Sequence, residues 1–98
     1  MNIAKTVEDT RLTLLLSGRL DTSTAPALEA TLQESLPGIT ELYFDFKELD
    51  YISSAGLRIL LSAQKTMSKQ GSMVIRNVSE DIYEVFDITG FTDILTIE

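Results

Sequence analysis

Cysteine and histidine are both absent from the 98 residues of this chain. Without cysteine there is no disulfide and no thiolate nucleophile, and without histidine there is no imidazole general base. The usual zinc sites, which are built from these two residue types, are excluded as well. These absences exclude many classes of enzyme, and we expect neither a metal site nor a cofactor.

Basic residues are scarce, with 8 lysines and arginines against 15 aspartates and glutamates and a formal net charge of −7. Such a charge repels nucleic acid and anionic membranes unless a strong basic patch offsets it. The basic residues, such as Lys65, Lys69 and Arg76, are scattered along the sequence. We therefore expect a protein partner rather than direct binding to nucleic acid, and the acidic surface favours a monomer.

Long apolar runs are missing too. No run approaches the ~20 residues that cross a bilayer. The first ten residues, MNIAKTVEDT, lack the basic-then-apolar order of a signal peptide. We therefore expect a cytoplasmic protein that does not bind membranes. The chain has the length of one small domain, so we expect a single domain over residues 1–98.

The first half of the sequence predicts a β-hairpin, a helix and a further strand. Strands are expected over residues 3–7 and 11–17, joined by an acidic turn. Apolar residues at helical spacing follow, with Thr24 as the candidate cap and Pro37-Gly38 as the stop. A strand is expected over residues 41–46, because the segment ELYFDF alternates between two faces.

The second half predicts two more helices and two more strands. A stripe of apolar residues indicates a helix that begins at Ser53 or Ser54. A strand over residues 72–78, a helix capped by Ser79 and a last strand over residues 94–97 complete the chain. Strands that alternate with helices after one hairpin indicate an α/β fold with a mixed sheet that contains parallel βα units.

The stretch Ser53-Ser54-Ala55-Gly56 is unusual at the start of an apolar helix. One serine hydroxyl is enough to cap a helix, and a glycine in the first turn costs up to ~1 kcal/mol relative to alanine. Capping therefore explains neither Ala55 nor Gly56. Small side chains leave the unpaired backbone amides of the first turn uncovered, so a phosphate or a closely packed partner can approach them. We predict that Ser54 both caps the helix and faces such a partner.

Three segments resemble the STAS domain of bacterial anti-sigma-factor antagonists. DYISSAGL, residues 50–57, is similar to the family signature in which a polar residue, a phosphorylatable serine, a small residue and Gly-Leu open this helix. LSGRLD, residues 16–21, followed by Thr24 and Ala25, is similar to the family's Gly-x-Leu-Asp segment. VFDITGF, residues 85–91, is a third match. The resemblance implies the STAS fold, in which a mixed sheet packs against three to four helices.

The resemblance also implies a function. Ser54 occupies the phosphoacceptor position, and the unmodified protein would bind a serine kinase that doubles as an anti-sigma factor, releasing the sigma factor. Phosphorylation of Ser54 from Mg-ATP would end that complex, and a PP2C-type phosphatase would reset it. The chain would then be the substrate of the kinase and not itself an enzyme.

The same resemblance implies the site residues. Ser53 stands where many members carry aspartate, so it remains an alternative acceptor, and Ala55 stands where many carry serine or threonine. Asp21 is expected near Ser54, although an Asx turn or a helix cap explains it equally well. The residues expected to bind the partner are Asp21, Thr22, Ser23, Thr24, Ser53, Ser54, Ala55, Gly56 and Arg58.

Two other interpretations remain open. Ser54 would be a catalytic nucleophile in a hydrolase, but SSAG is not a G-x-S-x-G elbow and no histidine or nearby lysine serves as its base. Alternatively, the chain would be a structural subunit, for instance of a lipid-transporting ABC system or a stress-signalling assembly. A serine at the acceptor position argues against that role. The sequence contains no Walker-type glycine loop, so we predict no dedicated nucleotide site.

Overall fold

The computed structural model describes residues 1–98 and contains a four-stranded sheet in the order β1-β2-β3-β4. The strands are β1 (Asn2–Glu8), β2 (Arg11–Leu20), β3 (Glu41–Ile52) and β4 (Ser72–Arg76). β1 and β2 pair antiparallel as a hairpin, whereas β2, β3 and β4 run parallel to one another. The predicted mixed sheet is confirmed.

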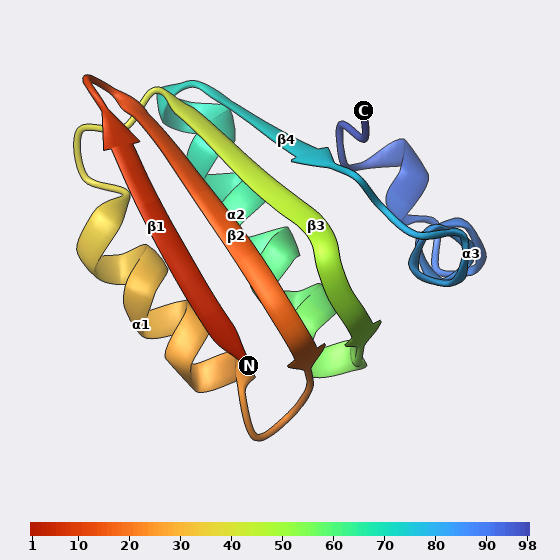
Figure 1. Cartoon of the computed structure of the whole chain (residues 1–98). Coiled ribbons are helices and arrows are strands. Elements are labelled where there is room, and N and C mark those ends of the chain that lie inside the picture. Colours follow the sequence, from red (N-terminus) through yellow and green to blue (C-terminus); the bar gives the residue numbers. More distant parts are fainter.

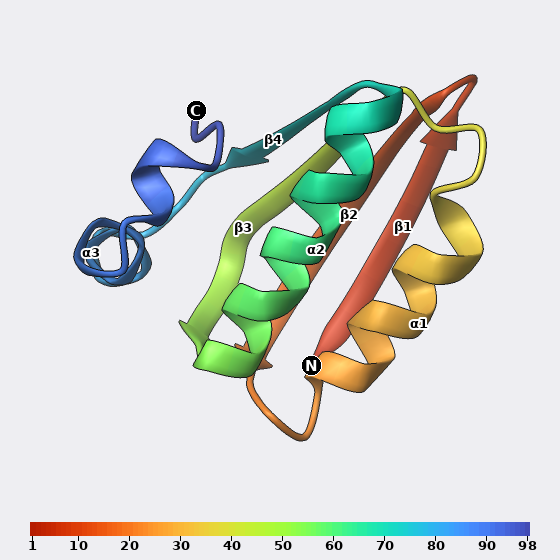
Figure 2. The same ribbon diagram turned by 180° about the vertical axis from the view of Figure 1, so that it is seen from behind.

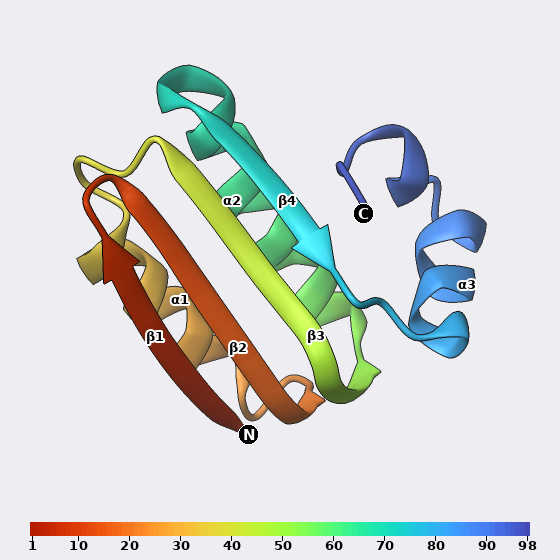
Figure 3. The same ribbon diagram turned by 45° about the horizontal axis from the view of Figure 1, so that its top comes forward.

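Three α-helices and a short 3-10 turn accompany the sheet: α1 (Ala25–Ser35), α2 (Ser54–Gln70), α3 (Glu80–Ile88) and η1 (Phe91–Asp93). α1 and α2 cover one face of the sheet, as the views from both sides show (Figures 1 and 2). α3 and η1 lie beyond β4, at the side of the sheet (Figure 3). None of the helices combines the length and the apolar composition that a membrane span requires.

The core lies between the sheet and its two covering helices. Because successive side chains of a strand point to opposite faces, every second residue of the central strands faces α1 and α2. The buried strand residues include Leu12, Leu14, Leu16, Leu42, Phe44, Phe46, Met73 and Ile75. The helices contribute residues at helical spacing, among them Leu28, Leu32, Leu57, Leu60 and Met67.

α3 joins this core through Ile82 and Phe86. Phe86 is fully buried, and its ring centroid lies 6.4 Å from that of Phe46 on β3. Phe91 is partly buried and packs against the same cluster. The interpretation of Phe86 as a core residue is confirmed, whereas Phe91 lies at the edge of the core.

β2 and β3 are longer than the sequence predicted. The pairing of β2 with β3 shifts register between Leu15 and Ser17 and again after Gly18. On β3 the exposed residues Lys47 and Glu48 break the alternation of buried and exposed positions, which is why the strand seemed to end at residue 46. β3 in fact continues to Ile52. With this irregular pairing, β2 extends to Leu20 and β3 to Ile52, and both strands end beside the start of α2.

The predicted last strand over residues 94–97 is wrong. Only one isolated parallel bridge forms there, between Ile97 and Ile75 of β4. The backbone amides of Ile94 and Leu95 donate to the carbonyl of Phe91. These two amides therefore belong to the turn around η1 and do not pair with β4. β4 likewise ends at Arg76 rather than residue 78, because the following Asn77 turns the chain with a φ of 58°.

Candidate functional site

Ser53 is the only residue between β3 and α2. Its backbone is extended, its amide donates to the carbonyl of Leu20 at 2.9 Å, and its hydroxyl accepts from the amide of Gly56 at 3.4 Å. Ser53 is thus tied to the end of β2 and caps α2. The prediction that Ser54 caps this helix is wrong.

Ser54 is the first residue of α2, and its side chain is exposed. Ser53 is half-buried and its hydroxyl serves the cap, whereas the Ser54 hydroxyl takes no part in the cap. The two adjacent serines therefore differ in availability. The geometry favours Ser54 over Ser53 as the hydroxyl that another protein can reach.

Packing inside the protein requires that Gly56 has no side chain. It is buried, and a Cβ placed on it would lie 2.7 Å from Cγ of Leu20 and 2.9 Å from Cγ1 of Ile52. These distances are shorter than van der Waals contact, so the first turn of α2 rests on the ends of β2 and β3. Packing inside the protein thus accounts for the glycine, and the contact of Gly56 with a partner stays a prediction. Ala55 is half-buried and packs against the core.

The loop of residues 21–24, which follows β2, forms the predicted Asx turn. Oδ1 of Asp21 accepts from the hydroxyl and the amide of Ser23, at 2.7 and 3.0 Å, and from the amide of Thr24 at 3.2 Å. These hydrogen bonds, above all the one from the Ser23 hydroxyl, lower the pKa of Asp21. The carboxylate is therefore negatively charged throughout the neutral range.

Thr24 does not act as the predicted side-chain cap of α1. Its hydroxyl accepts from the amide of Asp21 at 2.9 Å and donates to the carbonyl of Arg19 at 2.8 Å. No side-chain hydrogen bond caps α1, and Pro26 in its first turn lacks an amide proton that would need one. Thr24 instead fixes the loop to the end of β2.

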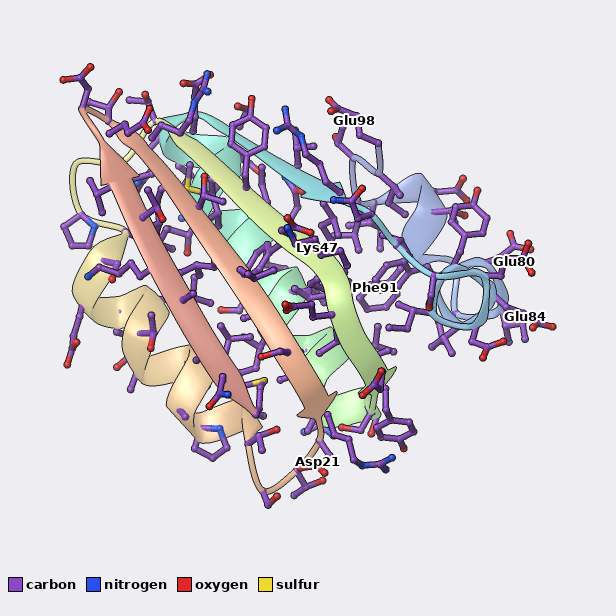
Figure 4. All side chains as sticks on the ribbon, in the orientation of Figure 1. Asp21, Lys47, Glu80, Glu84, Phe91 and Glu98 are labelled. Atoms are coloured by element: carbon purple, nitrogen blue, oxygen red, sulfur yellow. The ribbon has the colours of Figure 1, made fainter.

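The parallel pairing brings this loop and the start of α2 together. Leu20 and Ile52 are register partners at the ends of β2 and β3. The loop after β2 and the N-terminus of α2 consequently lie at the same end of the sheet, where Figure 4 labels Asp21. Of the nine predicted partner-binding residues, the exposed ones are Thr22, Ser23, Ser54 and Arg58.

Two further residues at this end were missed from the sequence. Arg19 and Tyr51 are register partners on β2 and β3, and the Arg19 guanidinium carbon lies 4.0 Å from the centroid of the Tyr51 ring. Nε of Arg19 is also 3.7 Å from Oδ2 of Asp21. Arg19 lies in the segment LSGRLD and Tyr51 in the segment DYISSAGL, both of which resemble the STAS family. Only the longer strands, with their shifted register, reveal that they meet.

Comparison with known proteins identifies the fold and the family. A family model described as STAS domain matches residues 2–98. The anti-sigma-B factor antagonist of Bacillus subtilis is 34% identical over 83 residues, which cover 84% of this chain and 76% of the relative. An anti-sigma factor antagonist from Mycobacterium paratuberculosis has a TM-score of 0.88 at 21% identity, covering 98% of this chain and 83% of that chain. The Bacillus cell fate determinant SpoIIAA in its phosphorylated form has a TM-score of 0.77 at 18% identity, covering 99% of this chain and 91% of that chain. The chain therefore belongs to the STAS domain family.

Proposed function

We propose that this protein is an anti-sigma-factor antagonist whose unphosphorylated form binds a serine-kinase anti-sigma factor and so releases the sigma factor. Membership of the STAS family and similarity to the anti-sigma-B factor antagonist of Bacillus subtilis support this proposal. The observation that carries it is the exposed Ser54 at the first position of α2, next to a serine that already caps the helix. A kinase can therefore modify Ser54 without removing the cap.

In the proposed cycle the kinase transfers the γ-phosphoryl group of Mg-ATP to Oγ of Ser54, with loss of the hydroxyl proton and release of ADP. The phosphate adds about −1.5 to −2 units of charge and three acceptor oxygens. No acidic residue lies in the first turn of α2. The positive end of the helix stabilises an added negative charge there by about 0.3–1 kcal/mol, so the fold survives the modification.

The same charge weakens the complex with the partner. Asp21 is already ionised at this end of the sheet, and Asp50 is exposed three residues before the cap. A phosphate that is buried unpaired in the interface costs about 2–5 kcal/mol, a loss of ~30- to several-thousand-fold in affinity. A PP2C-type phosphatase then removes the phosphate and restores binding.

In this proposal the chain is a substrate and a switch, and it performs no catalysis. Serine nucleophiles need a base, and the sequence has no histidine for that role. The basic residue closest along α2 is Arg58, one turn after Ser54, and a guanidinium stays protonated in proteins.

The test is binding of the unmodified protein and of Ser54→Ala, Ser54→Asp and Ser53→Ala to the serine-kinase anti-sigma factors of the source organism. Intact-mass measurement after addition of Mg-ATP follows each binding experiment. We expect the unmodified protein, Ser54→Ala and Ser53→Ala to bind, and Ser54→Asp to lose binding. One phosphate should appear on the unmodified protein and on Ser53→Ala, and none on Ser54→Ala.

Two results would contradict this outcome in different ways. A phosphate on Ser54→Ala but not on Ser53→Ala would make Ser53 the acceptor. No binding and no phosphate with any of these kinases would favour the structural-subunit role instead.

A further inference from the structure

An arginine and a tyrosine form an exposed pair at the carboxyl ends of β2 and β3. Tyr51 is 40% exposed, and the side chain of Arg19 is 61% exposed. The guanidinium stacks over the ring, with its central carbon 4.0 Å from the ring centroid. A large aromatic face and a cation are thus presented together to solvent.

The surrounding loop holds this pair in place. The Thr24 hydroxyl donates to the backbone carbonyl of Arg19, and Oδ2 of Asp21 lies 3.7 Å from Nε of Arg19. The other oxygen of Asp21 is occupied by the Asx turn. The loop therefore fixes the backbone of Arg19, and the guanidinium lies between the Tyr51 ring and the Asp21 carboxylate, an arrangement that lowers the ordering entropy lost when a partner binds.

The pair is continuous with the phosphoacceptor. Ser54 follows Tyr51 by three residues, and the amide of the intervening Ser53 donates to the carbonyl of Leu20, the residue after Arg19. Arg19 and Tyr51 therefore border, along the chain, both the loop of residues 21–24 and the start of α2, the two segments that a partner covering Ser54 would meet.

We infer that Arg19 and Tyr51 form a preorganised anchor for the anti-sigma factor, an inference that rests on the proposed function. Tyrosine and arginine are, together with tryptophan, enriched among the residues that contribute most to binding at protein interfaces. The exposed face of Tyr51 takes an apolar side chain of the partner, and the outer edge of the Arg19 guanidinium takes a carboxylate. Ser54 then decides whether binding occurs, and this pair sets how tight it is and with which partner.

The chain contains a matched control with the same chemistry elsewhere. Tyr43 on β3 is stacked by the guanidinium groups of Arg76 and Arg11, whose central carbons lie 4.2 and 5.1 Å from its ring centroid. Tyr43 and Tyr51 are eight residues apart on β3, about 26 Å along an extended strand. Substitutions in this second stack change the same contacts at a place far from Ser54.

The experiment compares the affinities of unphosphorylated variants for the cognate anti-sigma kinase by calorimetry. Tyr51→Ala and Arg19→Ala should each weaken binding at least tenfold, while Tyr43→Ala and Arg76→Ala change it less than twofold. Since the pair acts as one unit, the double variant should lose clearly less than the product of the two single losses. With Mg-ATP, Tyr51→Ala should raise the KM for phosphorylation and leave kcat unchanged, because Ser54 is intact.

Affinities of Tyr51→Ala and Arg19→Ala within twofold of the unmodified protein would overturn the anchor. If Ser54→Asp still abolished binding in that case, the proposed switch would stand without it. Absence of binding by the unmodified protein would overturn both. Thermal unfolding curves of all four alanine variants confirm that the compared proteins are folded.

Discussion

α2 and α3 both begin with a serine cap directly after a strand or its short extension, yet their first turns differ at every position. The hydroxyl of Ser53 accepts from the amide three residues on at 3.4 Å, and that of Ser79 does the same at 3.2 Å. After the cap, α2 continues with Ser54-Ala55-Gly56 and α3 with Glu80-Asp81-Ile82. The cap is shared, whereas the charge and the volume that follow it are not.

The difference shows what each helix end is built for. Glu80 supplies a permanent negative charge at the first position of α3, where it complements the helix dipole. Ser54 occupies the corresponding position of α2 and supplies no charge until it is phosphorylated. Phosphorylation would therefore give α2 the charge pattern that α3 carries permanently. At the third position, α3 has the buried side chain of Ile82, whereas α2 has Gly56, against which Leu20 and Ile52 from β2 and β3 pack.

Removing the apolar anchor of α3 should have the largest effect on this comparison. Ile82 is 2% exposed and packs in the core. Ile82→Ala should lower the free energy of unfolding by about 2–5 kcal/mol, because it removes buried methyl groups and leaves a cavity. Urea unfolding measures the change, and Tyr83→Ala, a substitution of an exposed neighbour, is the control. A loss below 1 kcal/mol would show that α3 contributes little to the folded core.

Adding a methyl group at the same position of α2 should also destabilise the protein. Gly56→Ala should lower the free energy of unfolding by about 1–3 kcal/mol through overpacking against Leu20 and Ile52. Alanine is the better helix former by up to ~1 kcal/mol, so a stabilised variant would mean that the two neighbouring side chains move aside easily. Gly56→Ala combined with Leu20→Ala tests this directly: the double variant removes Cγ of Leu20, the atom nearest the added methyl group, so it should lose less than the sum of the two single losses.

These two positions also mark the limit of what the sequence can predict. Helical spacing of apolar residues predicted both helices, and serine predicted both helix starts. Periodicity within one segment does not reveal that Leu20, from a distant strand, fills the space beside Gly56. The pair formed by Arg19 and Tyr51 was missed for the same reason, because the register of two parallel strands is a tertiary property.

Irregular elements account for the remaining errors. The predicted end of β3 was wrong because Lys47 and Glu48 interrupt the alternation of apolar and polar residues from which a strand is recognised. The last strand was overestimated because ILTI has the composition of a strand, while the turn at η1 leaves only Ile97 in position to pair. The candidate site was found through motif residues, but which of two adjacent serines caps the helix depends on backbone geometry alone.

The two caps provide a smaller effect that separates Ser53 from Ser54. Ser53→Ala and Ser79→Ala should each lower the free energy of unfolding by about 0.5–2 kcal/mol, because each leaves a helix amide without its side-chain acceptor. Ser54→Ala should change it by less than about 0.5 kcal/mol, as expected for an exposed position without a cap role. Urea unfolding of the three variants side by side gives the answer. A larger loss for Ser54→Ala than for Ser53→Ala would mean that Ser54 is the cap in solution.

The smallest effect is electrostatic, and it tests whether α2 accepts the charge that α3 already carries. Ser54→Glu should raise the free energy of unfolding by about 0.3–1 kcal/mol relative to the uncharged Ser54→Gln at low ionic strength, and Glu80→Gln should lower it by a similar amount. Both differences should shrink in 1 M salt, where the screening length falls to about 3 Å. Ser62→Glu compared with Ser62→Gln, at an exposed position further along α2, controls for the added repulsion in a chain of net charge −7. If Ser54→Glu were instead less stable than Ser54→Gln, repulsion from the ionised Asp21 would outweigh the helix dipole, and phosphorylation would act by weakening the fold as well as by blocking the partner.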